Sequence, residues 1–178
     1  MAKKTENNFA FIDVETTGLN AEVHEIIEVG VVISDNDFNV VSEFEIKIKP
    51  ENIETADPTA LRVNKYNEED WQNSVSLAEA IQTLSEKTAD CIMVGHNVSF
   101  DSLFLEKAFR KLNIPNKMFY YKLDTLSIAF AVGANDPDIN HLSLHSLCEH
   151  FGIENKKAHT ALSDARATFE LFKKLLHN

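Results

Sequence analysis

Two short, nearly continuous apolar segments occupy residues 9–15 (FAFIDVE) and 26–33 (IIEVGVVI). Their length suits strands, and apolar side chains at successive positions are typical of strands covered on both faces, as in the interior of an α/β sheet. Residues 43–49 alternate instead between charged and apolar side chains, which predicts an edge strand with one face in water. The first 50 residues therefore predict three strands of one sheet.

Helical and strand patterns alternate through the rest of the chain. Apolar spacing predicts helices over residues 58–63, 76–87, about 98–113, 124 to about 132, 142–151 and 160–176, with strands over 91–94 and near 118–122. Three early strands followed by strand-helix alternation predict an α/β fold in which helices flank a mixed sheet.

Composition indicates one soluble domain. The chain has 178 residues, of which 44% are hydrophobic, enough to fill one sizeable core. No repeat, low-complexity segment or Pro/Gly/Ser-rich linker interrupts it, so residues 1–178 are expected to form a single domain. No signal peptide or membrane-spanning run is visible, and Cys91 and Cys148 lie in apolar patterns without metal-type spacing. We expect a cytoplasmic protein with reduced cysteines and no membrane contact.

The net charge of −11 limits how the protein can bind nucleic acid. Binding along a duplex usually depends on many contacts between basic side chains and phosphates. The charge therefore argues against tight nonspecific duplex binding. It is compatible with a site that grips a strand end and uses some of its acids to bind metal.

Asp13 and Glu15 lie two positions apart at the carboxyl end of the first predicted strand. Their side chains should share one face, at the sheet edge where open α/β folds place ligands. An Asp-x-Glu pair alone is common at solvent-facing strand ends. Here the strand looks buried, and two buried carboxylates are costly without a cation. The context therefore favours a metal site.

Two further segments supply acids and a histidine. Asp101 falls in the first turn of a predicted helix, in line with its apolar face, so it should point inward; the alternative is an acid that complements the helix dipole. Asp164 falls in the last helix, five residues after His159. Histidine suits a general base, since its unperturbed pKa is about 6.5. Alone, His159 could be a capping or surface histidine and Asp164 a surface acid.

Three segments together carry a family resemblance. Residues 13–19 (DVETTGL), 96–101 (HNVSFD) and 159–165 (HTALSDA) resemble, in order and spacing, the three motifs of the DEDDh (DnaQ-like) 3'-5' exonucleases. The resemblance covers about residues 8–176. It implies a ribonuclease H-like α/β fold with a central mixed five-stranded sheet flanked by helices.

The resemblance also implies a role for each motif residue. Asp13, Glu15, Asp101 and Asp164 would hold two Mg²⁺ or Mn²⁺ ions, and His159 would activate the attacking water. The substrate would be the 3' end of a single-stranded nucleic acid, hydrolysed to nucleoside 5'-monophosphates. Further residues are expected to contact the terminal nucleotide: Thr16, Leu19, Asn64, Asn97 and Phe100. Thr59 and Asn64 stand where proofreading relatives carry a Glu and a His, which weakens any transfer of sugar selectivity.

Three functions fit these residues. The first is a DNA exonuclease, free-standing or partnered with a DNA polymerase. The second is an RNA-trimming enzyme of the oligoribonuclease or ribonuclease T type, and the third is a non-catalytic binding module on the same fold. Retention of all five motif residues argues against the third. The short stretch after the last predicted helix favours a stand-alone role, and monomer and dimer remain equally open.

Overall fold

A computed structural model describes residues 6–133, 136–155 and 159–176. Within these ranges five strands form one sheet in the order β3-β2-β1-β4-β5. The strands are β1 (Phe9–Thr16), β2 (Ile26–Ser34), β3 (Val40–Lys47), β4 (Ile92–Gly95) and β5 (Lys122–Asp124). The β1-β2 and β2-β3 pairs are antiparallel, whereas β1-β4 and β4-β5 are parallel. The mixed five-stranded sheet predicted from the sequence is therefore confirmed.

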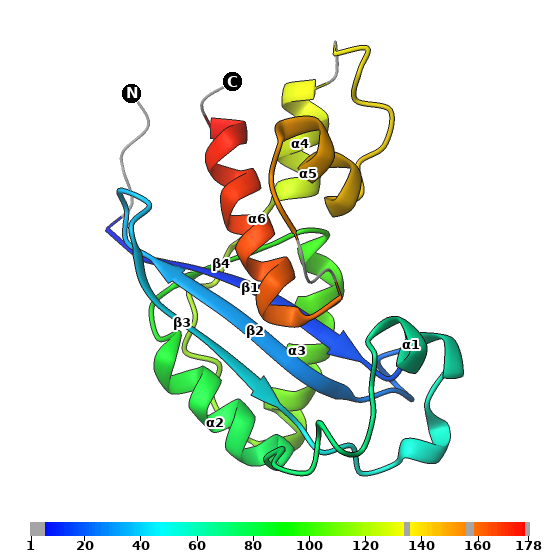
Figure 1. Ribbon diagram of the computed structural model, residues 1–178. Helices are drawn as coiled ribbons and strands as arrows, with labels where there is room; N and C mark the ends of the chain where they lie inside the picture. Colours follow the sequence, from blue (N-terminus) through cyan, green and yellow to red (C-terminus); the bar gives the residue numbers. More distant parts are fainter. Residues whose placement is uncertain (1–5, 134–135, 156–158, 177–178) are drawn as a thin grey trace.

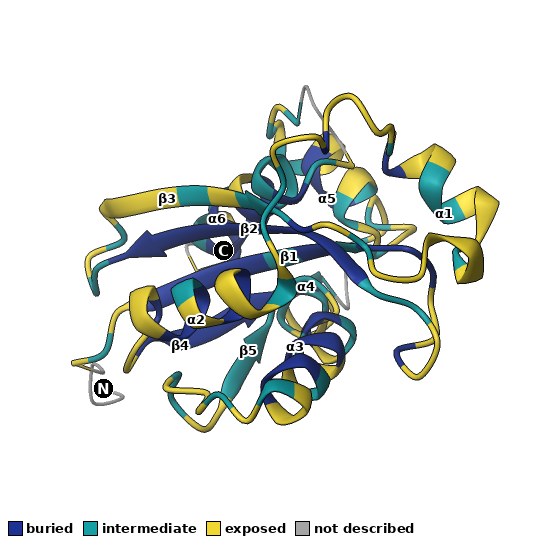
Figure 2. Ribbon diagram, turned by 90° about the horizontal axis from the view of Figure 1, so that it is seen from below, coloured by how far each residue is buried: buried dark blue, intermediate teal, exposed yellow. Residues whose placement is uncertain are grey.

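Burial follows the hydrophobic patterns of the strands. Every residue of β2 and β4 is buried, and β1 is buried except at Asp13 and Glu15, which are half-buried. The edge strand β3 is mostly exposed, as Figure 2 shows. The exposed edge confirms the interpretation of the alternating segment.

Helices cover both faces of the sheet. Figure 1 shows α2 and α3 on one face and α4, α5 and α6 on the other, with α1 beyond the end of β1. The helices are α1 (Pro58–Val63), α2 (Leu77–Lys87), α3 (Val98–Leu112), α4 (Thr125–Gly133), α5 (Leu144–Phe151) and α6 (Ala161–Leu176), with a short 3-10 turn at η1 (Ile53–Thr55). Asp57, Ser76 and Ser143 cap three of them by accepting backbone N–H groups.

The alternation of β1 divides the core into two layers. Phe9 and Phe11 face α6, and the ring centroids of Phe11 and Phe169 lie 5.0 Å apart. Ala10, Ile12 and Val14 face the opposite way, into the core formed with α2 and α3. Because side chains alternate along a strand, Asp13 and Glu15 must lie on the α6 side.

One predicted strand was misplaced. Residues 118–122 were expected to form the last strand, but β5 begins only at Lys122, which pairs with Met93. The rings of Phe119, Tyr120 and Tyr121 pack against one another instead of alternating across a sheet. The strand-like composition of this segment therefore reflects a local aromatic cluster.

Cys91 and Cys148 are both buried free thiols, as the sequence predicts. In the part of the chain that the structure describes, no helix combines the length and apolar character needed to cross a membrane.

Candidate metal centre

Three carboxylates converge at the carboxyl end of β1. Ligand atoms of Asp13, Glu15 and Asp164 all lie within 4.8 Å of one another. The first two come from the α6 side of β1, and the third from the first turn of α6. An Asp and a Glu two apart in a strand thus meet an acid that follows them by about 150 residues. Three of the four acids that the sequence predicts for one site thus lie together.

A glycine allows α6 to approach the sheet at this point. Gly30 pairs with Asp13 across β1 and β2. A Cβ atom on Gly30 would lie only 2.1 Å from the backbone carbonyl carbon of Ala161, the first residue of α6. Any side chain at this position would push α6 away from the sheet. The absence of one brings Asp164 within reach of Asp13.

Local hydrogen bonds orient the Asp164 carboxylate. The side-chain amide of Asn155 donates to Oδ1 at 2.5 Å, and the backbone N–H of His159 donates to Oδ2 at 3.1 Å. Asn155 in turn accepts from the hydroxyl of Ser163 at 2.7 Å. Sequence reasoning missed Asn155, because a polar residue in a loop carries no signal of its own.

Asp101 joins the site from the other side of β1. It is buried in the first turn of α3, and its Oδ1 accepts the backbone N–H of Val14 at 3.0 Å. The pairing of β1 with β4 ends at Phe11, so Asp101 satisfies an N–H that has passed the end of the neighbouring strand. The inward orientation predicted from helical spacing is confirmed.

The turn before α3 is fixed by Asp124. Its Oδ1 accepts the backbone N–H groups of Asn97 at 2.8 Å and Val98 at 3.3 Å. Asn97 adopts a left-handed backbone with φ of 62°, which turns the chain sharply from β4 into α3. Asp124 therefore sets where α3 starts and hence where Asp101 points.

Burial and mutual repulsion raise the pKa values of these acids. The pKa of Asp13 lies well above its ordinary value, first because the carboxyl is buried and then because of the charges of Asp101, Glu15 and Asp164. Burial, followed by the charge of Asp164, raises the pKa of Glu15 from 4.5 to about 8. Burial raises the pKa of Asp101 to about 7, although the N–H of Val14 opposes the shift. A bound cation would offset both the burial of the carboxylates and their mutual repulsion. Carboxylate oxygens are also the ligands that hard divalent cations prefer.

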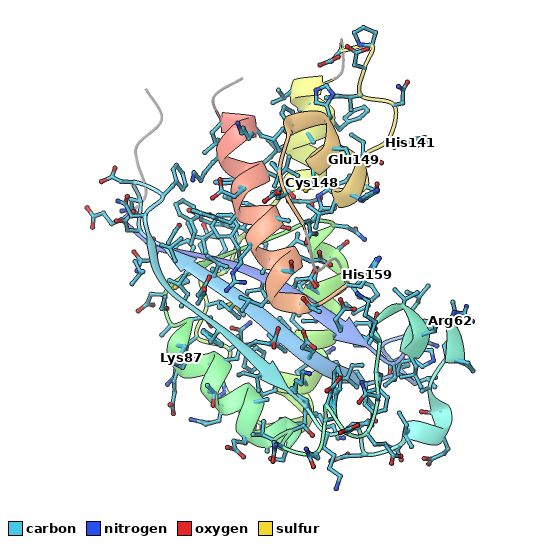
Figure 3. The ribbon with its side chains drawn as sticks, viewed as in Figure 1. Arg62, Lys87, His141, Cys148, Glu149 and His159 are labelled. Carbon is cyan, nitrogen blue, oxygen red and sulfur yellow. The ribbon has the colours of Figure 1, made fainter. Side chains whose placement is uncertain are left out.

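His159 lies beside this cluster. Its side chain is exposed and its backbone is left-handed, with φ of 67°. Figure 3 shows His159 beside the first turn of α6, on the side where α1 and the end of β1 lie. The imidazole is thus open to solvent, while the backbone is tied to Asp164.

A cavity of about 280 Å³ adjoins the acids. It lies between the end of β1, α1 and the start of α3, and its lining includes Glu15 and four of the five expected substrate residues: Thr16, Leu19, Asn64 and Phe100. Leu19 is 81% exposed, so it presents an apolar surface to anything that enters. Asn97 does not line this cavity; its side-chain oxygen accepts from the hydroxyl of Ser99.

Asn64 also has a structural contact. It is buried, and its side-chain amide donates to the carbonyl of Thr16 at 2.8 Å, which ties α1 to the end of β1. Thr59 lines the same cavity. A larger cavity of about 520 Å³ lies near the end of α3, from Glu106 to Asn116, away from the acids. Convergence of carboxylates, not cavity size, therefore locates the site.

Glu28 was not singled out from the sequence, yet it lies next to the cluster. It pairs with Glu15 across β1 and β2 and is buried. Burial, followed by the charge of Glu45, raises its pKa to about 7. The signal that could have found it is a single acid within an otherwise apolar strand.

Comparison with known proteins agrees with this geometry. The family model RNase_T, described as Exonuclease, matches residues 10–172. The chain is 31% identical over 171 residues to the PolC-type DNA polymerase III of Bacillus subtilis, covering 96% of this chain and 12% of the relative. It is 32% identical over 177 residues to the 3'-5' exonuclease DinG of Staphylococcus aureus (strain USA300), covering 94% of this chain and 19% of the relative. The chain thus spans less than a fifth of the length of these relatives.

Solved structures of exonuclease I share the fold. One matches with a TM-score of 0.84 and 21% identity, covering 96% of this chain and 40% of that chain. The Escherichia coli enzyme in complex with a dT13 oligonucleotide matches with a TM-score of 0.81 and 19% identity, covering 95% of this chain and 41% of that chain.

Proposed function

The chain belongs to the RNase_T exonuclease family, and from this premise we propose that it hydrolyses single-stranded DNA from the 3' end, releasing nucleoside 5'-monophosphates. The observation that carries the proposal is the convergence of Asp13, Glu15 and Asp164, with Asp101 beside them. A similar relative is named a 3'-5' exonuclease, and a solved structure with the same fold contains a DNA oligonucleotide.

We propose that the four acids hold two divalent cations, Mg²⁺ or Mn²⁺. The donors that converge among the described residues are all carboxylates, whose oxygens these hard cations prefer. When bound, the cations supply charge stabilisation to the attacking and leaving oxygens of the phosphodiester. The protein's own contribution is to hold Asp164 with Asn155 and Asp101 with the N–H of Val14, so that the carboxylates are preorganised.

His159 is proposed as the general base. An imidazole nitrogen would take a proton from the attacking water as the phosphodiester bond breaks. Its exposure leaves the ring accessible to water and substrate, and the hydrogen bond from its backbone to Asp164 keeps it next to the acids.

The cavity next to Glu15 is proposed to receive the terminal nucleotide. Leu19 and Phe100 offer apolar surfaces on which any base can stack, which suits removal of nucleotides regardless of sequence. Thr16 and Asn64 would lie by the sugar of the terminal nucleotide. Asn97 would lie by the DNA strand where that strand approaches α3.

Partner and location follow from the same premise. A DNA polymerase is the proposed protein partner, since one relative is itself a polymerase. A cytoplasmic location is proposed because both cysteines are free thiols, which a reducing compartment maintains.

Labelled single-stranded DNA tests the proposal. With Mg²⁺ or Mn²⁺, a 3'-labelled strand should release its label first as a mononucleotide, whereas a 5'-labelled strand should shorten gradually. Release of the 5' label first, or internal cuts at the earliest times, would show that the proposed polarity is wrong.

A further inference from the structure

The interior strand β2 contains one ionisable side chain, Glu28, which is only 3% exposed. A buried carboxyl group is costly unless its oxygens are hydrogen-bonded. None of the roles proposed above uses this residue. Its position in a fully buried strand therefore calls for a partner that compensates its burial.

One partner of this carboxyl is the start of α6. Oε1 of Glu28 accepts the backbone N–H of Ala161 at 2.8 Å, across 133 residues of sequence. Ala161 is fully buried and is the first residue of the helix. The first N–H groups of a helix have no partner within the helix, so the carboxyl satisfies a donor that water cannot reach.

The contact lies where the helix and sheet are closest. Gly30, two residues along β2 on the same face, leaves room for the backbone of Ala161. Asp164 follows Ala161 by one helical turn and accepts from the N–H of His159. A shift of Ala161 would therefore move both the third acid of the cluster and the histidine.

We propose that Glu28 is a positioning residue for metal binding: by accepting the N–H of Ala161 it fixes the first turn of α6, so that Asp164 meets Asp13 and Glu15. The role depends on an acceptor oxygen that reaches the N–H of Ala161, and not on the charge of the carboxyl group. It rests on the proposed metal site, and it differs from direct ligation because the bonded Glu28 oxygen faces the helix backbone.

Two substitutions separate reach from charge. Glu28→Gln keeps an acceptor oxygen at the same distance from the backbone and removes the charge, whereas Glu28→Asp keeps the charge and shortens the side chain by one methylene. Binding of Mn²⁺ to metal-free protein, measured by electron paramagnetic resonance of the free ion, reports on the site without requiring turnover. We expect Glu28→Gln to bind within about twofold of the wild type and Glu28→Asp to bind roughly tenfold or more weakly, as for other residues that orient metal ligands.

Ser85→Ala is a matched control. Ser85 is also buried, and its hydroxyl donates to the carbonyl of Pro115 at 2.6 Å, on the α2 side of the sheet. This substitution should lower stability but leave Mn²⁺ affinity unchanged. The same result for Glu28→Asp would show a structural role only and overturn the proposal, as would equal losses in Glu28→Gln and Glu28→Asp.

Asp13→Asn distinguishes failure of the metal site from failure of the Glu28 role. If Asp13→Asn binds Mn²⁺ like the wild type, the proposed metal site is wrong. If it loses binding while folded Glu28→Asp does not, the metal site stands and the role of Glu28 is wrong. Should Glu28→Asp fail to fold, Glu28→Gln still decides, because a tenfold loss there contradicts an acceptor role.

Discussion

When no cation is present, the carboxyl groups of Asp13, Glu15 and Asp101 keep their protons to a higher pH than ordinary carboxyl groups do. Each is surrounded by protein and by other acids, so each has a raised pKa. Perturbed pKa values of this kind are common where a protein is built to bind a charged partner. At the scale of single residues, ionising these carboxyl groups costs free energy, and a bound metal ion would offset that cost.

This cost predicts how stability depends on pH. In the folded protein the pKa of Glu15 rises from 4.5 to about 8 and that of Asp101 from 3.8 to about 7. A raised pKa means that the folded state holds protons that the unfolded chain has released. The contribution of these two acids to the free energy of unfolding is therefore complete below about pH 4 and is lost as pH rises towards 8. In chelator, the free energy of unfolding from urea titrations should fall across this window.

Added Mn²⁺ should reverse that loss. The stabilisation by the ion should be larger at about pH 8 than at about pH 5, because protonated carboxyls do not bind metal. A metal-free protein whose stability is flat between these values would contradict the electrostatic account of the cluster.

His159 gives a second prediction at this scale. His159→Ala should lower turnover by roughly a hundredfold or more, the usual effect of losing a general base. The contact with Asp164 that the structure describes uses the backbone N–H of His159, which the substitution keeps, so Mn²⁺ affinity should change little. The control is His145→Ala, because His145 is also exposed but lies on α5. Turnover equal to the wild type in His159→Ala would show that another group activates water.

At the scale of elements, the site depends on how closely α6 packs on β2. Gly30→Ala would place a Cβ against the backbone of Ala161, which cannot move aside as a side chain can. We expect a loss of about 1–3 kcal/mol in the free energy of unfolding, as for other overpacked positions, together with weaker Mn²⁺ binding.

Gly133→Ala is the matched substitution. Among the described residues, its added methyl group would come closest to the tip of the Ile139 side chain, which can rotate away. It should leave Mn²⁺ affinity as in the wild type. If both variants bind metal equally well, close packing of α6 is not what holds Asp164 in place.

The elements also show what a sequence can reveal. Alternation along a strand was enough to place Asp13 and Glu15 on one face, and helical spacing was enough to turn Asp101 inward. Glu28 escaped notice because its partner, Ala161, is 133 residues away and offers only a backbone N–H. β5 was misplaced because aromatic residues that pack on each other have the composition of a strand. Local periodicity is visible in sequence, whereas contacts between distant backbones are not.

At the scale of the whole molecule, the net charge of −11 limits binding to few phosphates. Two cations at the acid cluster and a cavity next to Glu15 would let the protein hold a strand end without a basic groove. Binding should therefore depend more on metal than on salt.

The cavity also predicts the preference between DNA and RNA. Its lining is largely apolar near Leu19, Val63 and Phe100, and an amide hydrogen of Asn64 is already bonded to Thr16. An apolar pocket rejects an added hydroxyl group only weakly, by up to about a hundredfold. Initial rates on matched strands should therefore favour DNA while RNA is still degraded. Faster degradation of RNA would favour the RNA-trimming alternative.

The most direct test of the metal-dependent exonuclease is to follow the shortening of a 5'-labelled single strand, with Mn²⁺ or chelator, by the wild type and Asp13→Asn. We predict a descending ladder of shortened strands for the wild type with Mn²⁺, and intact strand in the other three reactions. A ladder that persists in chelator, or that Asp13→Asn produces at the wild-type rate, would contradict the account.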